Sequence, residues 1–206
     1  MSSVVPSWQE RVEIAESENT PPEQLVQLAS DKSHNVRKAV AENPNTPPKA
    51  LTVLGSAEEV IVRCKVARNP STPHELLAVL VSDENESVRW NVARNPSTPP
   101  EALSILTRDE SWPVRCMVAH NPNTPPETLA VLAGDTDRNV RYQVVQHPNI
   151  PVELLVALAS DEYVNIREAA SESAAARGID LPGLIAQMQQ QAAVSSLLEL
   201  DDSIGL

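Results

Sequence analysis

Aromatic residues are scarce in this chain of 206 residues, which has no phenylalanine, three tryptophans and two tyrosines. Leucine, valine and alanine must therefore supply nearly all of the buried surface, a composition that suits helices. Glycine is scarce as well, and five glycines could not build several phosphate-binding or nucleophile loops. The sequence contains no glycine-rich phosphate loop, nucleophile elbow, HExxH or CxxC pair. We therefore expect a protein that is not an enzyme and that carries no cofactor and no metal.

Cysteine and long hydrophobic runs are also rare. The two cysteines, Cys64 and Cys116, are too few for a disulfide framework or a four-cysteine zinc site, and we expect free thiols. The N-terminus has no basic region followed by an apolar run, and eighteen consecutive apolar residues occur nowhere in the chain. These features predict a soluble, cytoplasmic protein that does not enter a membrane.

Basic residues are outnumbered by acidic ones, 16 to 28, which gives a net charge of −12. Because phosphate backbones and anionic membranes select basic surfaces, this balance disfavours both as partners. Proline is abundant instead, with 18 residues. Proline is confined to turns and to the first turn of helices, so the chain must be punctuated at many points.

A period of 26 residues runs through the chain. Leucine recurs at this interval from Leu25 and again from Leu28, valine recurs from Val36, and the phrase NPSTPHE at residues 69–75 returns twice in slightly altered form. Arginine marks the same period at Arg11, Arg37, Arg63, Arg89, Arg115, Arg141 and Arg167. Such a period predicts units that bury their apolar faces against one another.

Each unit is predicted to form two short helices. The first helix begins at Thr-Pro-Pro-Glu, where Thr98 would cap the helix and Glu101 would complete a capping box. The second helix begins after Ser33, Asn85, Ser111 or Asp137 in successive copies and ends at Asn43-Pro44 and its equivalents. Helices this short are unstable alone, so we expect stacking of the units to stabilise them.

The repeating unit LAxDxxxxVRxxVAxNPxTPPExL resembles the leucine-rich variant repeat, a helical solenoid family with paired short helices in a right-handed superhelix. It is also similar to HEAT-like repeats, which share an aspartate six residues before an arginine at the seam between units. Here that spacing occurs in Asp31 and Arg37, Asp83 and Arg89, Asp109 and Arg115, Asp135 and Arg141, and Asp161 and Arg167. The resemblance implies an architecture and leaves the function open. The step of 26 residues is longer than is usual in the family.

We therefore predict an all-α fold, a right-handed α-solenoid of six 26-residue two-helix repeats with a partial N-terminal repeat and a C-terminal capping helix. Residues 1–16 would form the partial repeat, residues 17–172 the six-unit array, and residues 173–206 the capping helix and an acidic tail. The apolar stripe of the last helix comprises Leu184, Ile185, Met188 and Leu198. It would cover the end of the stack or dock to another chain.

The recurring polar residues are predicted to be structural. An arginine accompanied by an aspartate in nearly every unit suits a stacking joint, where a guanidinium binds a carboxylate and helix-end carbonyls. This structural ladder comprises Arg37, Arg63, Arg89, Arg115, Arg141 and Arg167. The series Asn43, Asn69, Asn95 and Asn121, with His147 as a departure, predicts a second ladder of side-chain amides.

Function is expected where the copies differ and face outward. The registers of His34, Lys38 and Glu42 form one outward ridge on the second helices. The ridge collects all three tryptophans, both cysteines and one tyrosine, and Trp, Tyr and Arg are the residues that anchor interfaces. The predicted partner-binding residues are Trp90, Arg94, Trp112, Tyr142, Cys116, His120, Arg68 and His34. The alternative is that close helix packing, marked by the alanines from Ala41 onward, covers the tryptophans and cysteines.

We predict a monomeric, non-enzymatic scaffold that binds a protein or peptide along this ridge. One alternative is a nucleic-acid binder that uses the basic residues Arg37, Arg63, Arg68, Arg89, Arg94 and Arg115. Another is an accessory or regulatory subunit of an enzyme. A catalytic or metal site at Cys116 and His120, four residues apart on one helix, lacks a third member.

Overall fold

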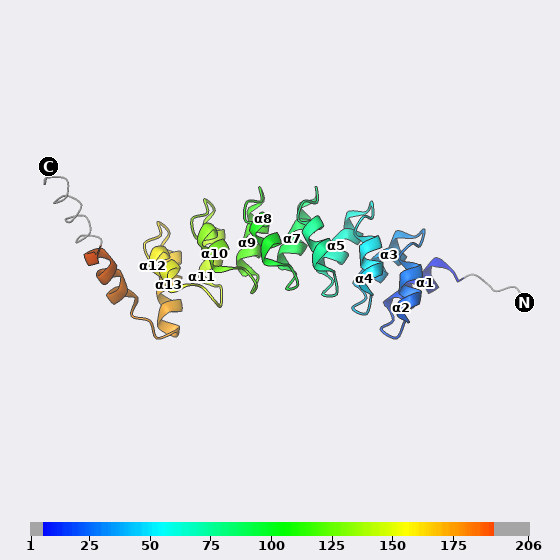
Figure 1. Ribbon diagram of the computed structural model, residues 1–206, viewed down its shortest axis with the longest axis horizontal. Helices are drawn as coiled ribbons and strands as arrows, with labels where there is room; N and C mark the ends of the chain where they lie inside the picture. The colour runs from blue at the N-terminus through cyan, green and yellow to red at the C-terminus, as the bar shows by residue number, and fades with distance from the viewer. Residues whose placement is uncertain (1–5, 192–206) are drawn as a thin grey trace, which may run out of the picture.

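The computed structural model describes residues 6–191 and shows a long row of paired helices, with the helix Trp8–Glu16 at one end and the helix Val164–Ala176 toward the other (Figure 1). The helices are α1 (Trp8–Glu16), α2 (Pro22–Leu28), α3 (His34–Glu42), α4 (Pro48–Leu54), α5 (Val60–Arg68), α6 (His74–Leu80), α7 (Glu86–Arg94), α8 (Pro100–Leu106), α9 (Trp112–His120), α10 (Pro126–Ala133), α11 (Arg138–Val145), α12 (Val152–Leu158) and α13 (Val164–Ala176). A further helical segment spans residues 181–191. The part of the chain that the structure describes contains no strand, and six helix pairs follow α1, as predicted.

The helices form two layers. The odd-numbered helices α1 to α13 form the second-helix layer, in which each helix packs directly on the next. The even-numbered helices α2 to α12 form the first-helix layer, and their contacts with one another are sparser. Alanine at Ala41, Ala67, Ala93 and Ala119 is fully buried. Such small side chains let the second helices approach closely, which makes this layer the more tightly packed of the two.

The core lies between the two layers and is filled by the recurring apolar residues. The leucines at the register of Leu25 and the valines at the register of Val36, including Ile166 in the last unit, are fully buried in all six units. Burial of each such side chain contributes roughly 1.5–3 kcal/mol. The helices are seven to nine residues long, apart from α13 with 13, so this burial between units stabilises helices that would not form alone.

The predicted capping box of the first helices was wrong. The Thr98 hydroxyl donates a hydrogen bond of 2.6 Å to the carbonyl of Val92, near the end of the preceding helix. The first helices instead begin after a proline that makes no side-chain cap bond. Proline at the start of a helix has no N–H to satisfy, which reduces the need for a cap. The threonine hydroxyl satisfies a helix-end carbonyl in its place.

The second-helix caps were predicted correctly in part. The side chains of Asn85 and Asp137 accept hydrogen bonds from the N–H groups two residues later. Ser33 and Ser111 stand at the same position without a side-chain cap bond. All second helices in the array are α-helices, and α3 ends at Glu42 with Asn43 as its cap, as the Asn-Pro pattern predicts.

Helix α13 is the last helix of the stack, and a further helical segment follows it. Helix α13 runs through the predicted boundary between residues 172 and 173 and ends before a turn at Gly178, whose φ of 68° suits glycine. In residues 181–191, Leu181 is buried and Ile185 packs against the core. Leu184 is half-buried and Met188 is exposed. Leu198 and the acidic tail lie outside the described residues, and the domain boundaries and the hand of the solenoid stay predictions.

Candidate partner-binding surface

The arginine of every second helix except α13 binds a carboxylate of the unit that follows it. Arg63 Nε and Nη2 donate to the two carboxylate oxygens of Asp83 at 2.7 Å and 3.0 Å. Its Nη1 donates to the carbonyls of Ala57 and Glu58 at 2.8 Å and 2.9 Å. The same bidentate joint links Arg11 to Asp31, Arg89 to Asp109, Arg115 to Asp135 and Arg141 to Asp161. The arginine ladder therefore makes the contacts of a stacking joint.

The pairing partner predicted for each arginine was wrong. The aspartate six residues before an arginine offers only its backbone carbonyl, as Asp83 does to Arg89 at 2.9 Å. Its carboxylate binds the arginine 20 residues earlier, in the preceding unit. That carboxylate also accepts the N–H of Asn85, which fixes its direction toward the preceding unit. An aspartate and the arginine six residues after it therefore belong to two neighbouring joints and do not form one ion pair.

The joints lower the pKa of four aspartates, Asp31, Asp83, Asp135 and Asp161. Burial alone would raise the pKa of Asp83 and of Asp135. Hydrogen bonds from the facing arginine and from one backbone N–H outweigh burial, so both pKa values lie below the ordinary value. The pKa of Asp31 and of Asp161 is lowered chiefly by the hydrogen bond from the arginine. Each of these four carboxylates is therefore ionised and held in place at neutral pH.

One joint and the last arginine depart from the pattern. Ala57 stands where the other units carry an aspartate, and Arg37 Nη2 binds Glu59 instead, at 2.6 Å. The second carboxylate oxygen of Glu59 is buried and has no hydrogen-bond partner. Arg167 donates hydrogen bonds to the carbonyls of Asp161 and Glu162. Within residues 6–191 it forms no ion pair.

A second ladder joins the C-terminal ends of the second helices. Asn95 Nδ2 donates to the carbonyls of Ala67 and Asn69 at 2.7 Å and 3.0 Å. Its Oδ1 accepts the N–H of Ser97 at 2.8 Å, so one side chain satisfies three backbone groups. Asn43, Asn69 and Asn121 make the same contacts in their own units. The amide ladder has the geometry that the sequence predicted.

His147 occupies the amide position in the next unit. Its Nε2 lies 3.1 Å from the carbonyl of Asn121, and its Nδ1 accepts the N–H of Asn149 at 3.1 Å. A neutral ring with the proton on Nε2 satisfies both contacts. Burial lowers the pKa of His147, and the nearby His120 lowers it further. The ring therefore replaces the amide only in its neutral form.

The outward ridge of the second-helix layer carries the predicted aromatic residues. Trp112 is 45% exposed and Tyr142 is 39% exposed, on neighbouring helices α9 and α11. Trp90 on α7 is half-buried and packs against the core, with the Arg94 guanidinium 5.4 Å from its ring centre. This distance is that of a cation–π contact. His34 is exposed on α3, at the register of Trp112 but three units away.

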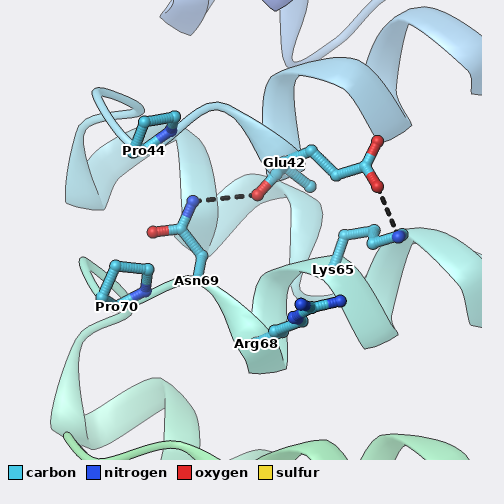
Figure 2. A pocket seen from close by; sticks show the side chains of 7 residues that line it. Glu42, Pro44, Lys65, Arg68, Asn69 and Pro70 are labelled. Carbon is cyan, nitrogen blue, oxygen red and sulfur yellow. Dashed lines mark hydrogen bonds and ion pairs between the residues drawn. The ribbon is translucent and has the colours of Figure 1, made fainter.

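A row of basic side chains follows the C-terminal ends of the same helices. Arg68, Arg94 and His120 line one shallow hollow together with Pro96 and Pro122. An adjoining hollow between α3 and α5 is lined by Glu42, Lys65, Arg68 and Asn69 (Figure 2). Lys65 forms an ion pair with Glu42 there, and Asn69 donates to the carbonyl of Ala41. Within residues 6–191, no ion pair includes Arg68 or Arg94.

Cys116 must be removed from the predicted surface. It is 8% exposed, and Cys64 is equally buried; both belong to the hydrophobic core. Burial, followed by the charges of Asp137 and Asp135, raises the pKa of Cys116 to about 11. The thiol is therefore protonated at neutral pH, and activation by His120 fails because that ring contacts Gln143 instead. The described residues contain no cluster of side chains that could hold a metal ion.

The sequence analysis missed an apolar row on the first-helix layer. Val53, Val79, Ile105 and Val131 are 46–68% exposed, at one position of four successive units. The signal was available, because these residues follow the buried leucines by two positions. Two positions correspond to about 200° around a helix, so such residues cannot share the buried face. Recurring residues are therefore not always packing residues.

Comparison with known proteins agrees with this geometry. The sequence pattern described as "Leucine rich repeat variant" matches residues 87–111, 112–137 and 138–162. A solved structure described as "A leucine-rich repeat variant with a novel repetitive protein structural motif" is 28% identical, covers 82% of this chain and 67% of its own, and has a TM-score of 0.63.

Two further solved structures align with lower scores. An engineered protein is 19% identical over 80% of this chain and 85% of its own, with a TM-score of 0.38. A designed armadillo repeat protein is 16% identical over 82% of this chain and 94% of its own, with a TM-score of 0.31. No curated protein matches the chain.

The protein is an all-α solenoid built of two-helix repeats. More narrowly, the repeats at residues 87–162 match the leucine-rich repeat variant model, and the fold is similar to a solved structure of that type. This fold is typical of protein-interaction scaffolds. Within the described residues, no helix has the length and apolar character needed to span a membrane.

Proposed function

We propose that the protein is a non-enzymatic scaffold that binds a protein partner along the ridge of its second-helix layer. The binding ridge consists of Arg68, Trp90, Arg94, Trp112, His120 and Tyr142. The observation that carries the proposal is the exposure of Trp112 and Tyr142, large aromatic side chains on the neighbouring helices α9 and α11. Large exposed aromatic residues are typical of interfaces and unusual on a surface that contacts only water.

The charges around these aromatics support the proposal. The structural arginines are engaged in joints, whereas Arg68 and Arg94 face a hollow and Arg94 stacks on Trp90. A guanidinium stacked on an aromatic ring is held in a restricted geometry, so less entropy is lost when it binds a partner. Aromatic residues and arginine together supply most of the binding free energy at protein interfaces.

The contacts of the arginines favour a protein partner over a nucleic acid. Of the six arginines that a nucleic acid could use, Arg37, Arg63, Arg89 and Arg115 are bound to carboxylates and have mostly buried side chains. Only Arg68 and Arg94 remain, and the chain as a whole has a net charge of −12. A duplex gains affinity from many cations that release its counterions, and two cations supply little of this.

The proposal is tested by affinity capture followed by direct binding measurements. The full chain is used as bait in wild-type form, as the variant Trp112→Ala with Tyr142→Ala, and as Trp8→Ala. Trp8 is a matched control, because it occupies the same register as Trp112, four units away, and is 46% exposed. We expect the double variant to lose the captured protein, with affinity lowered about 100-fold in calorimetric titration with that protein, while Trp8→Ala retains it.

Helicity is measured in parallel by circular dichroism. Both substituted side chains are exposed, so we expect the melting curves of the variants to match the wild type. Equal affinity of the double variant and the wild type would refute the ridge as the binding surface. Loss of helicity would refute it as well, because the aromatics would then serve the fold. An enzyme recovered with the wild type would identify this chain as its accessory subunit.

A further inference from the structure

The first-helix layer presents an apolar stripe that the proposed function does not use. The stripe consists of Val53, Val79, Ile105 and Val131, one residue from each of the helices α4, α6, α8 and α10. Val79 is 68% exposed and Ile105 is 57% exposed. The neighbouring positions Ala78, Ser104 and Ala130 are exposed small residues, so nothing large shields the stripe.

Acidic residues flank the stripe on both sides. Along the N-terminal ends of the first helices, exposed glutamates recur at Glu23, Glu75, Glu101, Glu127 and Glu153. Helix α4 carries Lys49 at the equivalent position. Along the loops after these helices, a second row is formed by Glu58, Glu84, Glu110 and Glu162, of which Glu84 and Glu110 have 89% exposed side chains. Arg108 and Lys49 are basic residues of this face next to the stripe.

The stripe is also hollowed between two of its helices. A depression between α8 and α10 is lined by Ile105, Arg108, Glu127, Thr128 and Val131. Thr128 at its base is buried and shares a hydrogen bond of 3.1 Å with Ser104. A side chain of a binding partner could contact both the apolar residues Ile105 and Val131 and the charged residues Arg108 and Glu127 in this depression.

The charges decide which occupant fits. A second copy of this chain would bring two acidic borders together, and an anionic membrane would be repelled by the same glutamates. A segment with an apolar face bordered by Lys or Arg meets both requirements of the surface. A helix repeats its face every seven residues, about 10 Å along its axis, which matches the spacing of about 8–10 Å between packed helices of successive units.

We propose that the first-helix layer is a second docking surface, which takes a basic amphipathic helix lying along the stripe. Its apolar residues pack on Val53, Val79, Ile105 and Val131, and its basic residues face the two glutamate rows. This surface lies on the layer opposite the binding ridge and does not depend on it. Two partners could then occupy the two layers of one solenoid at the same time.

The test uses a fluorescently labelled synthetic peptide of three heptads, with leucines along one face and lysines bordering them. A matched peptide carries glutamate in place of each lysine. Binding to the full chain is followed by fluorescence anisotropy, at low and at high salt, for the wild type and two variants. The stripe variant is Val79→Ser, Ile105→Ser, Val131→Ser, and the border variant is Glu75→Gln, Glu101→Gln, Glu127→Gln.

We expect the lysine peptide to bind the wild type and the glutamate peptide not to bind. The affinity of the lysine peptide falls at least about tenfold in the stripe variant and about three- to tenfold in the border variant, with a weaker salt dependence in the latter. The ridge variant Trp112→Ala with Tyr142→Ala is the control and binds as tightly as the wild type. The substituted residues are exposed, so thermal melting of each variant is unchanged.

Three results would overturn the proposal. Unchanged affinity in the stripe variant would show that the peptide binds by charge alone. Equal binding of the glutamate peptide would show that the two glutamate rows do not select a basic partner. Self-association of the wild type that the stripe variant abolishes, measured by sedimentation velocity, would assign the stripe to a second copy of this chain.

Discussion

At the scale of single residues, the amide position shows how two different side chains meet one requirement. Asn95 satisfies two carbonyls and one N–H, whereas His147 satisfies one carbonyl and one N–H with its two ring nitrogens. The sequence identified both the ladder and its departure. It could not show that the histidine must stay neutral, because that depends on its burial and on the N–H of Asn149.

His147 should make stability dependent on pH. Its folded pKa lies below the ordinary value of 6.5, so the unfolded chain takes up the proton more readily. The stability that the neutral ring provides is therefore complete above about pH 6.5 and is lost as the pH falls from there toward the lowered pKa. We expect His147→Asn to flatten the dependence of the free energy of unfolding between pH 7 and pH 5, measured by urea titration.

His74→Asn serves as the control for this substitution, because His74 is exposed on α6 and has no part in the ladder. It should leave the pH dependence as in the wild type. An equally steep dependence in the His147→Asn variant would show that other groups titrate in this range.

At the scale of helices, periodicity predicted the pairs of helices and the residues of the core. The leucine and valine registers lie where a helical period of 3.6 residues places a buried stripe, so local geometry sufficed. The joints were not predictable in the same way. Whether Asp83 binds Arg89 or Arg63 depends on the placement of one unit on the next, and residues 6 and 20 apart are equally consistent with a repeat of 26.

The joint made by Arg37 should be weaker than its equivalents and open to repair. Ala57 lacks the carboxylate, and Glu59 leaves one buried oxygen without a partner. We expect Ala57→Asp combined with Glu59→Ser, which restores the residues of other units, to raise the free energy of unfolding by about 1 kcal/mol. The melting temperature should rise by about 2–4 °C in calorimetry.

Ala57→Asp alone is the matched control. It leaves Glu59 beside the new carboxylate, and the repulsion between the two should remove most of the gain. A double variant that is less stable than the wild type would show that the contact between Arg37 and Glu59 stabilises this joint more than an aspartate at position 57 does.

At the scale of the whole molecule, the sequence predicted the array and its outward ridge, but it assigned one ridge residue wrongly and missed one surface. Cys116 shares its register with Tyr142, yet it is buried and Tyr142 is exposed. The phenol side chain of tyrosine is much longer than a thiol, so a shared register does not fix the exposure of the residue that occupies it. The exposed register of Val79 was not predicted, because recurrence alone does not separate a buried apolar register from an exposed one.

A break in a central joint should divide the array. Arg115→Gln leaves Asp135, whose side chain is 8% exposed, without its bidentate partner. Removal of one member of a buried ion pair costs about 3 kcal/mol. Because each unit contacts only its neighbours, the two units formed by α10 to α13 should open before the larger N-terminal part. Hydrogen exchange should show faster exchange in α10 to α13 than in α2 to α7.

Arg11→Gln is the control at the end of the array. Arg11 joins α1 to the first complete unit through Asp31, so its loss should accelerate exchange in α1 and leave the remaining helices unchanged. Uniform acceleration across all helices in either variant would mean that the array unfolds as one unit.

Because the same joint recurs at successive seams, the gene can gain or lose whole repeats without loss of the contacts between units. Each guanidinium meets its carboxylate 20 residues later at five seams with the same pair of hydrogen bonds. Duplication or excision of one 26-residue block would recreate such a seam at the new boundary. Evolution could thus lengthen or shorten the molecule by whole blocks, and combine different ridge and stripe residues, without redesigning the junctions that hold it together.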